Sequence, residues 1–160
     1  EPADIRASLI AQNPAEEQPG WLMKFPGKRG TTGTVTNNLD IIRLAEVYLI
    51  AAEAALKTGD QALADNYLNT LLAARTNGQV SVSNAGTDRI LHERRLELVG
   101  EGHRFFDLMR NNRPVERAGN DHLPSAPLSI PVSDHRTIEP IPRIELDANP
   151  EIEQNPGYQS

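Results

Sequence analysis

The segment ERRLELVGEGHRFFDLMR, from Glu93 to Arg110, mixes charged and apolar residues more closely than a surface helix does. It holds four arginines, three glutamates and an aspartate among leucines, two phenylalanines, two glycines and a methionine. Surface helices gather their apolar residues in one stripe. On a helix that begins at Ile90, Arg94 falls on the apolar sector between Leu91 and Leu98. A charge that faces a core is destabilising unless an opposite charge meets it, so the segment predicts a partly buried ion network.

We interpret this network as structural rather than catalytic. Carboxylates beside arginines also occur in acid–base sites, because their pKa values are shifted there. The sequence has no nucleophile or paired-carboxylate arrangement that favours a hydrolase, and we expect no catalytic residue. The predicted members of the network are Glu93, Arg94, Arg95, Glu97, Glu101, Arg104 and Asp107.

Composition limits the classes of function. The chain has 160 residues, enough for one domain with a core. Its formal charge of −6 disfavours a nucleic-acid surface, which selects for basic patches. It has no cysteine, and no apolar run approaches the roughly 18 residues that span a bilayer. It begins at Glu1 without a signal peptide, so we expect a part of a longer protein.

The prolines divide the chain into three parts. Four lie in the first 26 residues, eight lie from Pro114 onward, and none lies between. Proline lacks an amide donor and has a fixed φ, so a block without it between proline-rich flanks is typical of a helical core. We predict an irregular segment over 1–39, a helical core over 40–112 and an extended proline-rich tail over 113–160 of the same domain. The fold class is mainly α, with the irregular segments packed on the helices.

The core is predicted to hold a helix pair over 41–75 and further helices over 87–99 and 103–111. Asp40 and Asp60 are suited to cap the two helices of the pair, with Gly59 between them. The charged residues of the first helix share one narrow sector, which predicts that its other sides are buried. These residues are Arg43, Glu46, Glu53 and Lys57.

The helix pair has the spacing of a tetratricopeptide unit. Small residues at Ala45, Ala52 and Ala64 allow two antiparallel helices to approach, and Tyr48 and Tyr67 fill the groove between them. Only one such unit is visible, whereas about three are needed for independent stability. We therefore expect partner helices outside this sequence.

Few residues are candidates for ligand contact. His103 and Asp107 are four apart, as two metal ligands on a helix would be, but an exposed histidine explains His103 as well, and we expect no metal or cofactor. Of Phe105 and Phe106, one is expected in the core and the other against the tail. Sugars stack on exposed aromatic rings, which makes Trp21 a weak glycan-binding candidate, although a loop anchor is the simpler interpretation.

Four segments together resemble the C-terminal part of SusD/RagB-family proteins. They are RLAEVYLIAAEAAL (43–56), ILHERRLELVGEGHRFFDLMR (90–110), PIPRIELDANP (140–150) and QNPGY (154–158). They occur in the order found in that family, and the stretch from the first to the last, about 40–158, is most of the chain. Asp4-Ile5-Arg6 and Lys24-Phe25 fit the same pattern more weakly.

The resemblance implies a mainly helical, non-enzymatic protein at the cell surface. Members of the family are outer-membrane lipoproteins, anchored through an N-terminal cysteine that this chain lacks. They bind oligosaccharides or other nutrients and deliver them to a SusC-type TonB-dependent transporter. Their ligand-binding aromatic residues lie largely upstream of the matched part. The alternative interpretation is a tetratricopeptide-type adaptor that binds proteins.

Overall fold

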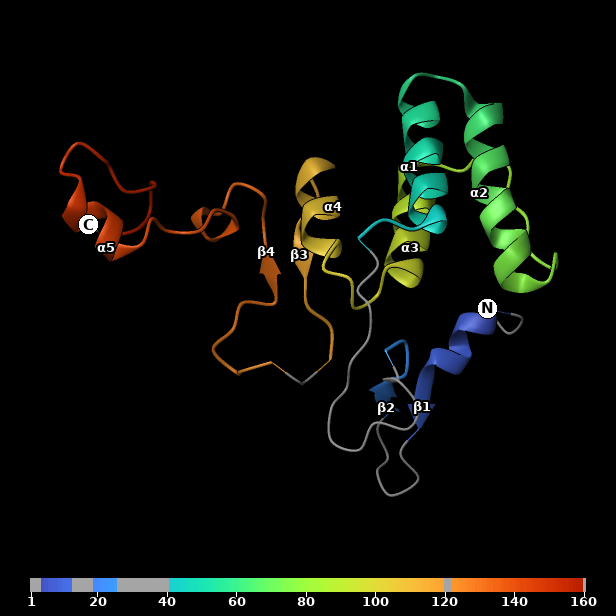
Figure 1. The fold of residues 1–160 in the computed structure, drawn as a ribbon, viewed down its shortest axis with the longest axis horizontal. Helices are drawn as coiled ribbons and strands as arrows, with labels where there is room; N and C mark the ends of the chain where they lie inside the picture. Colours follow the sequence, from blue (N-terminus) through green and yellow to red (C-terminus); the bar gives the residue numbers. More distant parts are fainter. Residues whose placement is uncertain (1–3, 13–18, 26–40, 120–121, 160) are drawn as a thin grey trace. The chain divides into compact units, whose positions relative to one another are not determined.

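The computed structural model describes residues 4–12, 19–25, 41–119 and 122–159, except the side chains at positions 11, 12 and 19–21. It divides into two compact units, residues 1–104 and residues 105–160. The mainly helical fold class predicted from the sequence is confirmed (Figure 1). No helix in the described part of the chain is both long enough and apolar enough to cross a bilayer.

Helices α1 (Leu44–Lys57) and α2 (Gln61–Thr76) form the predicted antiparallel pair, lying side by side in Figure 1. Two residues determine the turn between these helices. Gly59 has a φ of +87°, which favours glycine, and the Asp60 side chain accepts a hydrogen bond of 3.0 Å from the Leu63 amide. The predicted cap at Asp40 lies outside the described residues, and α1 begins after Arg43.

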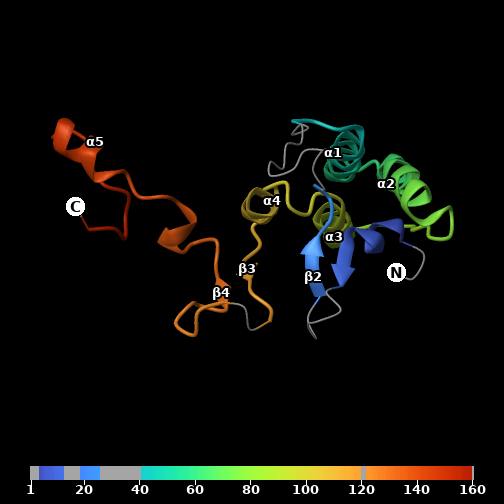
Figure 2. The ribbon, with the colours of Figure 1, turned by 60° about the horizontal axis from the view of Figure 1, so that its bottom comes forward.

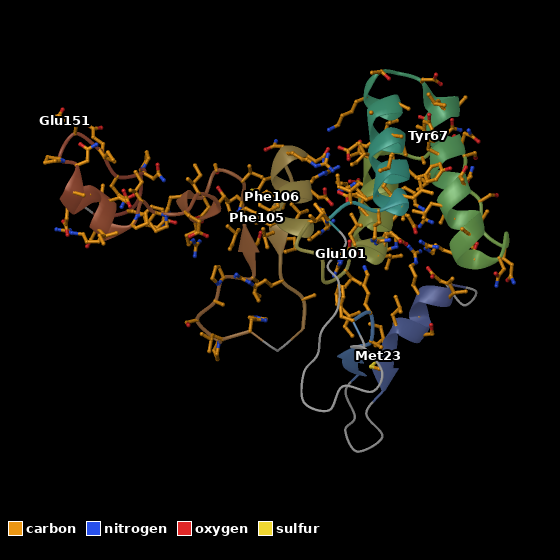
Figure 3. The ribbon with its side chains drawn as sticks, viewed as in Figure 1. Met23, Tyr67, Glu101, Phe105, Phe106 and Glu151 are labelled. Atoms are coloured by element: carbon orange, nitrogen blue, oxygen red, sulfur yellow. The ribbon has the colours of Figure 1, made fainter. Side chains whose placement is uncertain are left out.

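Small and aliphatic residues fill the space between these helices. Leu49 and Ala52 of α1 and Leu68 of α2 have no exposed surface, and Ala64 is equally buried. The rings of Tyr48 and Tyr67 lie with their centroids 6.1 Å apart, a tilted aromatic pair (Tyr67 is labelled in Figure 3). The close packing predicted from the tetratricopeptide spacing is confirmed.

The prediction of which sides of α1 are buried was wrong. Two residues of the charged sector, Glu46 and Glu53, are buried. In contrast, Leu44, Val47 and Ile50 are exposed, although they are apolar. The reason is that buried carboxylates can be paired: Lys57 Nζ lies 2.8 Å from Glu53 Oε1, four residues along the helix.

Helix α3 (Thr87–Glu97) packs against α1, after a loop that α2 holds in place. The side-chain amide of Asn69 donates to the Val82 carbonyl at 2.9 Å and accepts from the Val82 amide at 2.8 Å. The carboxylate of Asp65 accepts from the amides of Asn84 and Ala85. These hydrogen bonds satisfy the backbone groups of the loop, and Ile90 of the helix that follows it is buried in the core.

The N-terminal segment of the first unit is a short helix followed by a hairpin. The 3₁₀ helix η1 (Ile5–Leu9) is capped by Asp4. Strands β1 (Ile10–Gln12) and β2 (Pro19–Leu22) then pair antiparallel, with Ala11 opposite Trp21 (Figure 2). This strand pair lies within the segment 1–39 that the sequence predicted to be irregular, and the pairing was not predicted.

The second unit contains more regular structure than the predicted extended tail. Helix α4 (Arg104–Arg110) crosses the boundary between the units. Strands β3 (Val115–Glu116) and β4 (Ser129–Ile130) form an antiparallel pair, followed by the 3₁₀ helix η2 (His135–Thr137) and the short helix α5 (Arg143–Ala148). The sequence analysis missed η2 and α5.

The QNPGY segment closes the end of the second unit on itself. The Gln154 side chain accepts from the Ile141 amide and donates to the Ile141 carbonyl, as a neighbouring strand would. The Tyr158 hydroxyl donates to the Ile138 carbonyl at 2.8 Å, and its ring meets the His135 ring edge-on. A Cβ on Gly157 would lie 2.5 Å from His135 Cβ, so this approach requires glycine. These contacts make Tyr158 a structural anchor.

Candidate functional site

Three glutamates at intervals of four residues form the centre of an ion network in the first unit. Glu93 and Glu97 lie on one face of α3, since residues four apart are neighbours on a helix. Glu101 follows just beyond the end of α3 and is labelled in Figure 3. We call these residues and the basic side chains that contact them the carboxylate network.

Glu97 receives three guanidinium groups. Arg75 of α2 binds both carboxylate oxygens at 2.9 Å, while Arg43 Nη1 lies 2.6 Å from Oε1 and Arg6 Nη1 lies 3.1 Å from Oε2. The residue is only 4% exposed. Burial raises the pKa of Glu97, but the hydrogen bonds from Arg75 and Arg43 outweigh burial and hold the pKa at about 2. Glu97 is therefore ionised at neutral pH.

Glu101 joins Arg43 to Lys24. Arg43, which precedes α1, donates to both oxygens of Glu101 at 2.8–3.1 Å, and Lys24 Nζ forms a short ion pair with Oε1. Burial raises the pKa of Glu101, but the hydrogen bonds from Arg43 and Lys24 have the larger combined effect. The pKa of Glu101 is therefore below its ordinary value.

The same two cations also cap the end of α3. Arg43 donates to the Glu97 carbonyl at 2.6 Å, and Lys24 donates to the carbonyls of Glu97 and Val99 at 2.7 and 3.1 Å. Carbonyls in the last turn of a helix have no partner within the helix, and positive charge is favoured there. Arg43 and Lys24 therefore satisfy both the carboxylates and the helix end.

Glu93 is fully buried and binds the N-terminal segment. Arg6 Nη2 lies 2.5 Å from Glu93 Oε1, and Arg89 Nη2, one turn earlier on α3, lies 3.4 Å from Oε2. Arg6 also forms a bidentate pair with Asp4, two residues away, through Nε to Oδ1 at 2.9 Å and Nη2 to Oδ2 at 2.6 Å. Burial lowers the pKa of the Arg6 guanidinium, but the carboxylates of Asp4 and Glu93 raise it above its ordinary value overall.

The carboxylate network contains the three glutamates that the sequence predicted for it. Glu93, Glu97 and Glu101 lie in it. Arg94 is buried, as its position on the helix predicts, whereas Arg95 is exposed. Arg104 donates to the Leu91 carbonyl at 3.4 Å, and Asp107, in the second unit, pairs with Arg110 at 2.7 Å.

The basic partners were not predicted from the sequence. Two come from the N-terminal segment, one directly precedes α1 and one lies in α2. These residues are Arg6, Lys24, Arg43 and Arg75. They lie between 22 and 91 residues from the glutamates in the hydrogen bonds that join them. The resemblance at Asp4-Ile5-Arg6, at Lys24-Phe25 and at Arg43 was the available signal for three of them.

The other candidate residues do not form a further site. Among the residues that the structure describes, no group of three or more histidine or acidic side chains is placed to hold a metal ion. His103 Nδ1 lies 3.7 Å from the buried Glu46 carboxylate. Phe105 and Phe106 are both exposed and meet edge-on, so the expectation that one lies in the core was wrong (Figure 3).

The glycan candidate Trp21 lies on the part of the chain that the network fixes. Its backbone is in β2, and its side chain lies outside the described structure. β2 follows η1 and β1, which contain the network residue Arg6, and precedes Lys24. At the turn after α3, a Cβ on Gly100 would lie 2.8 Å from Leu22 Cδ2, so β2 ends in direct contact with this turn.

A groove of about 290 Å³ lies beside η1 and α3. Apolar side chains dominate its lining, with charge contributed by Arg6, Asp4 and Arg95. Such a lining favours aliphatic groups more than a polyhydroxylated sugar, which needs aromatic faces and several hydrogen-bond partners. The arrangement as a whole can hold a loop rigidly on a helical support, and it shows no catalytic constellation among the described residues.

Comparisons with known proteins agree with this architecture. The sequence profile described as the SusD family matches residues 12–158. SusD-like protein P38 of Formosa agariphila is 34% identical over 135 residues, and SusD-like protein P25 of the same organism is 29% identical over 133 residues. The matches cover 76% and 77% of this chain. The chain spans only 25% of the length of each of these relatives.

Solved structures match over almost the whole chain. A SusD superfamily protein from Bacteroides thetaiotaomicron is 44% identical with a TM-score of 0.87, covering 98% of this chain and 38% of its own. A SusD superfamily protein from Bacteroides vulgatus is 41% identical with a TM-score of 0.86, covering 100% and 37%. A second B. vulgatus structure, described as a putative sugar binding protein, is 36% identical with a TM-score of 0.87, covering 99% and 37%. By sequence profile, relatives and fold, this chain belongs to the SusD family.

Proposed function

We propose that this chain is the C-terminal portion of a cell-surface glycan-binding protein that works with a SusC-type TonB-dependent transporter to import oligosaccharides. The protein binds its ligand and passes it on without chemical change. In this proposal it is a lipoprotein of the outer membrane, and the glycan site is completed by residues that this chain does not contain. Support comes from family membership and from the solved relative described as a sugar binding protein.

The carboxylate network is the observation in this structure that carries the proposal. Rigid support reduces the entropy that a binding loop loses when it contacts a ligand. Arg6 and Lys24, on either side of the β1–β2 hairpin, both bind carboxylates of the α3 region. The network therefore anchors the hairpin that carries Trp21 at both of its ends. In the proposed function the network is a support, and Trp21 is a weak candidate for contact with a sugar ring.

A tetratricopeptide-type adaptor is the second candidate, and the exposed apolar face of α1 favours it. The two functions differ in what they bind. An adaptor would retain a protein or peptide partner and bind no glycan.

A glycan array probed with the full-length protein tests the proposed function. We expect binding to at least one class of oligosaccharide and copurification with a TonB-dependent transporter. If the protein binds no glycan on the array and no transporter copurifies, the proposed function is wrong.

Trp21 can be tested separately because it is the only tryptophan in the 160-residue chain. In the full-length protein, Trp21→Ala is expected to weaken binding to the array-selected oligosaccharide by at least tenfold, and Trp21→Phe by much less, since phenylalanine keeps an apolar ring. Phe106→Ala, a change at an exposed aromatic residue of the second unit, is the control. Equal affinity of Trp21→Ala and the unmodified protein would remove Trp21 from the site while leaving glycan binding intact.

A further inference from the structure

Helix α2 ends at an asparagine that is followed by a glycine. Asn77 has a φ of +51° and a ψ of +39°, the left-handed conformation, and Gly78 has a φ of +75°. Both residues are exposed, although Thr76 directly before them is buried. Asn77-Gly78 is the only Asn-Gly dipeptide in the 160-residue sequence. Because glycine has no Cβ, its amide nitrogen can approach the side chain of the preceding residue closely.

Asparagine is one of the chemically labile residues of proteins, and an Asn-Gly dipeptide can lose ammonia without an enzyme. The Gly78 amide nitrogen attacks Cγ of Asn77, the new N–Cγ bond closes a succinimide ring, and the Cγ–Nδ2 bond breaks. The amide proton of Gly78 leaves with Nδ2 as ammonia. Water then opens the ring at either carbonyl, which gives aspartate or isoaspartate. The overall change is the hydrolysis of one side-chain amide, so water is the only co-reactant.

In the folded chain, the last turn of α2 binds the nitrogen that would react. The Gly78 amide donates to the Ala73 carbonyl at 3.0 Å, and the Gln79 amide donates to the Thr76 carbonyl at 3.0 Å. The Val80 amide donates to the Thr76 hydroxyl at 3.1 Å. We call these three hydrogen bonds the end cap of α2. The Gly78 amide has to give up its hydrogen bond and its proton before its nitrogen can attack, so the end cap opposes the reaction.

We propose that Asn77 is a modification site, at which a succinimide forms and is hydrolysed to aspartate or isoaspartate when the end cap of α2 opens. Proteins open locally, and exposed helix ends open more readily than buried helix centres. The rate of modification in the native protein is therefore the rate in the open form multiplied by the fraction of time that the end cap is open.

The modified end of α2 is close to the carboxylate network. Arg75, in the last turn, donates to both carboxylate oxygens of Glu97 at 2.9 Å. Isoaspartate lengthens the backbone by one carbon, and aspartate adds negative charge at a helix C-terminus, where negative charge is unfavourable. Either product therefore weakens the turn from which Arg75 binds Glu97. This inference does not depend on glycan binding.

Two other asparagines with the same backbone conformation serve as internal comparisons. Asn84 and Asn112 both have a φ of +53°, and they are followed by Ala85 and Arg113. A side chain on the following residue hinders the approach of that residue's amide nitrogen. We therefore expect both asparagines to react more slowly than Asn77.

Two threonine variants of the full-length protein test the end cap. Thr76 and Thr70 each donate a side-chain hydroxyl to the carbonyl four residues earlier, at 2.8 Å in both cases. Only the Thr76 hydroxyl also accepts from the Val80 amide. Thr76→Val therefore removes one hydrogen bond of the end cap, and Thr70→Val is the matched control. Ile90→Val, at a fully buried position of α3, controls for lower global stability.

The native proteins and a urea-unfolded sample are incubated at mildly alkaline pH, and mass spectrometry of the peptide that contains residue 77 measures the conversion over time. We expect Asn77 to convert at least tenfold more slowly in the native protein than in the unfolded one. In the unfolded protein it should convert at least tenfold faster than Asn84. Thr76→Val should raise the native rate at least threefold, whereas Thr70→Val and Ile90→Val should leave it within about twofold.

Three results would overturn the proposal. If Asn77 does not convert in the unfolded protein, it is not a modification site. If the native and unfolded rates are equal, or if Thr76→Val leaves the native rate unchanged, the end cap does not control the reaction. If Ile90→Val raises the rate as much as Thr76→Val does, the reaction requires global unfolding rather than opening of the end cap.

Discussion

Glu97 is the residue on which the carboxylate network converges. Three guanidinium groups from η1, from the residue before α1 and from α2 meet its carboxylate. Replacing a whole buried ion pair by apolar residues is often neutral, whereas removing one partner leaves a buried charge uncompensated. We therefore expect the network to select one packing arrangement of these segments more than it raises net stability, and we expect single substitutions of its members to be destabilising.

Glu97→Gln keeps the shape of the side chain and removes its charge. We expect the free energy of unfolding of the 160-residue chain to fall by about 3–5 kcal/mol, because three cations lose their shared counter-charge. Urea denaturation measures the change. Glu151→Gln, at an exposed position of the second unit, is the control and should stay within about 0.5 kcal/mol of the unmodified chain. A loss no larger than that of the control would show that Glu97 is not a centre of the network.

The lowered pKa of Glu97 also predicts how stability depends on pH. The ordinary pKa of 4.5 applies in the unfolded chain and about 2 in the folded one, so the folded state favours the ionised carboxylate. This contribution is complete above about pH 4.5 and is lost as the pH falls toward 2. The pKa values of Glu101 and Asp4 are shifted in the same direction; for Asp4 the hydrogen bond from Arg6 is the main cause.

Unfolding free energies measured between pH 7 and pH 2 check this expectation. The difference between the unmodified chain and Glu97→Gln should be largest above pH 4.5 and shrink below it. A difference that stays constant with pH would mean that the charge of Glu97 is not responsible.

At the scale of single residues, the sequence predicted one half of the network. The spacing of Glu93, Glu97 and Glu101 and the burial of Arg94 follow from helical periodicity, which acts over a few residues. Arg6, Lys24 and Arg75 could not be assigned as partners, because periodicity carries no information about which distant segment packs against a helix.

At the scale of elements, the turn after α3 controls where the N-terminal hairpin ends. Gly100 and Gly102 both have φ near +79°, but they differ in surroundings. A Cβ on Gly100 would meet Leu22 at 2.8 Å and Phe25 at 3.3 Å, whereas a Cβ on Gly102 would meet no described atom within 4 Å. A substitution at Gly102 therefore tests backbone strain alone, whereas a substitution at Gly100 tests backbone strain together with the contact with β2.

Gly100→Ala is expected to destabilise the 160-residue chain by about 2–4 kcal/mol, since it adds a steric clash to the strain of a left-handed backbone. Gly102→Ala should cost about 1–2 kcal/mol from backbone strain alone. Thermal unfolding measures both, and the fluorescence of Trp21, next to Leu22, reports the position of β2. If the two variants are equally stable, the contact with Leu22 adds nothing to the cost of the substitution at Gly100.

The elements that the sequence analysis missed have identifiable causes. Helix α5 lies between Pro142 and Pro150, and prolines on both sides were interpreted as extended chain, although a proline directly before a helix is compatible with its first turn. The wrong sector of α1 was predicted to be exposed. Periodicity shows that the charged residues share one side of the helix, but it does not show whether oppositely charged side chains of other residues pair with them there. The α1–α2 turn was predicted correctly because Gly59 and Asp60 act locally.

At the scale of the whole molecule, the helical fold and the family could be predicted from the sequence. Helical periodicity and turn residues predict the helical fold, whereas the family follows from the resemblance of four segments in their order along the chain. The predicted domain boundaries stay a prediction, as does the role of Trp21 in glycan binding. The carboxylate network holds the N-terminal segment, residues 4–12 and 19–25, on the helices of the first unit.

The chain contains its own control for this claim. Asp4-Ile5-Arg6 and Asp134-His135-Arg136 form the same local structure, in which the aspartate caps a 3₁₀ helix and the arginine two residues later binds it. Arg6 also binds Glu93 and Glu97, and only 9% of its side chain is exposed, compared with 45% for Arg136. Replacing each arginine by methionine removes the same local pair, but only Arg6→Met removes contacts with α3.

Hydrogen–deuterium exchange of Arg6→Met and Arg136→Met in the 160-residue chain is the most direct measurement. We expect Arg6→Met to lose protection at the amides of residues 5–12 and 19–23, among them the Met23 amide that donates to the Leu9 carbonyl, while α1 and α2 keep their protection. Arg136→Met should leave the protection of these amides unchanged. Unchanged protection of residues 5–12 and 19–23 in Arg6→Met would show that the network does not hold this segment in place.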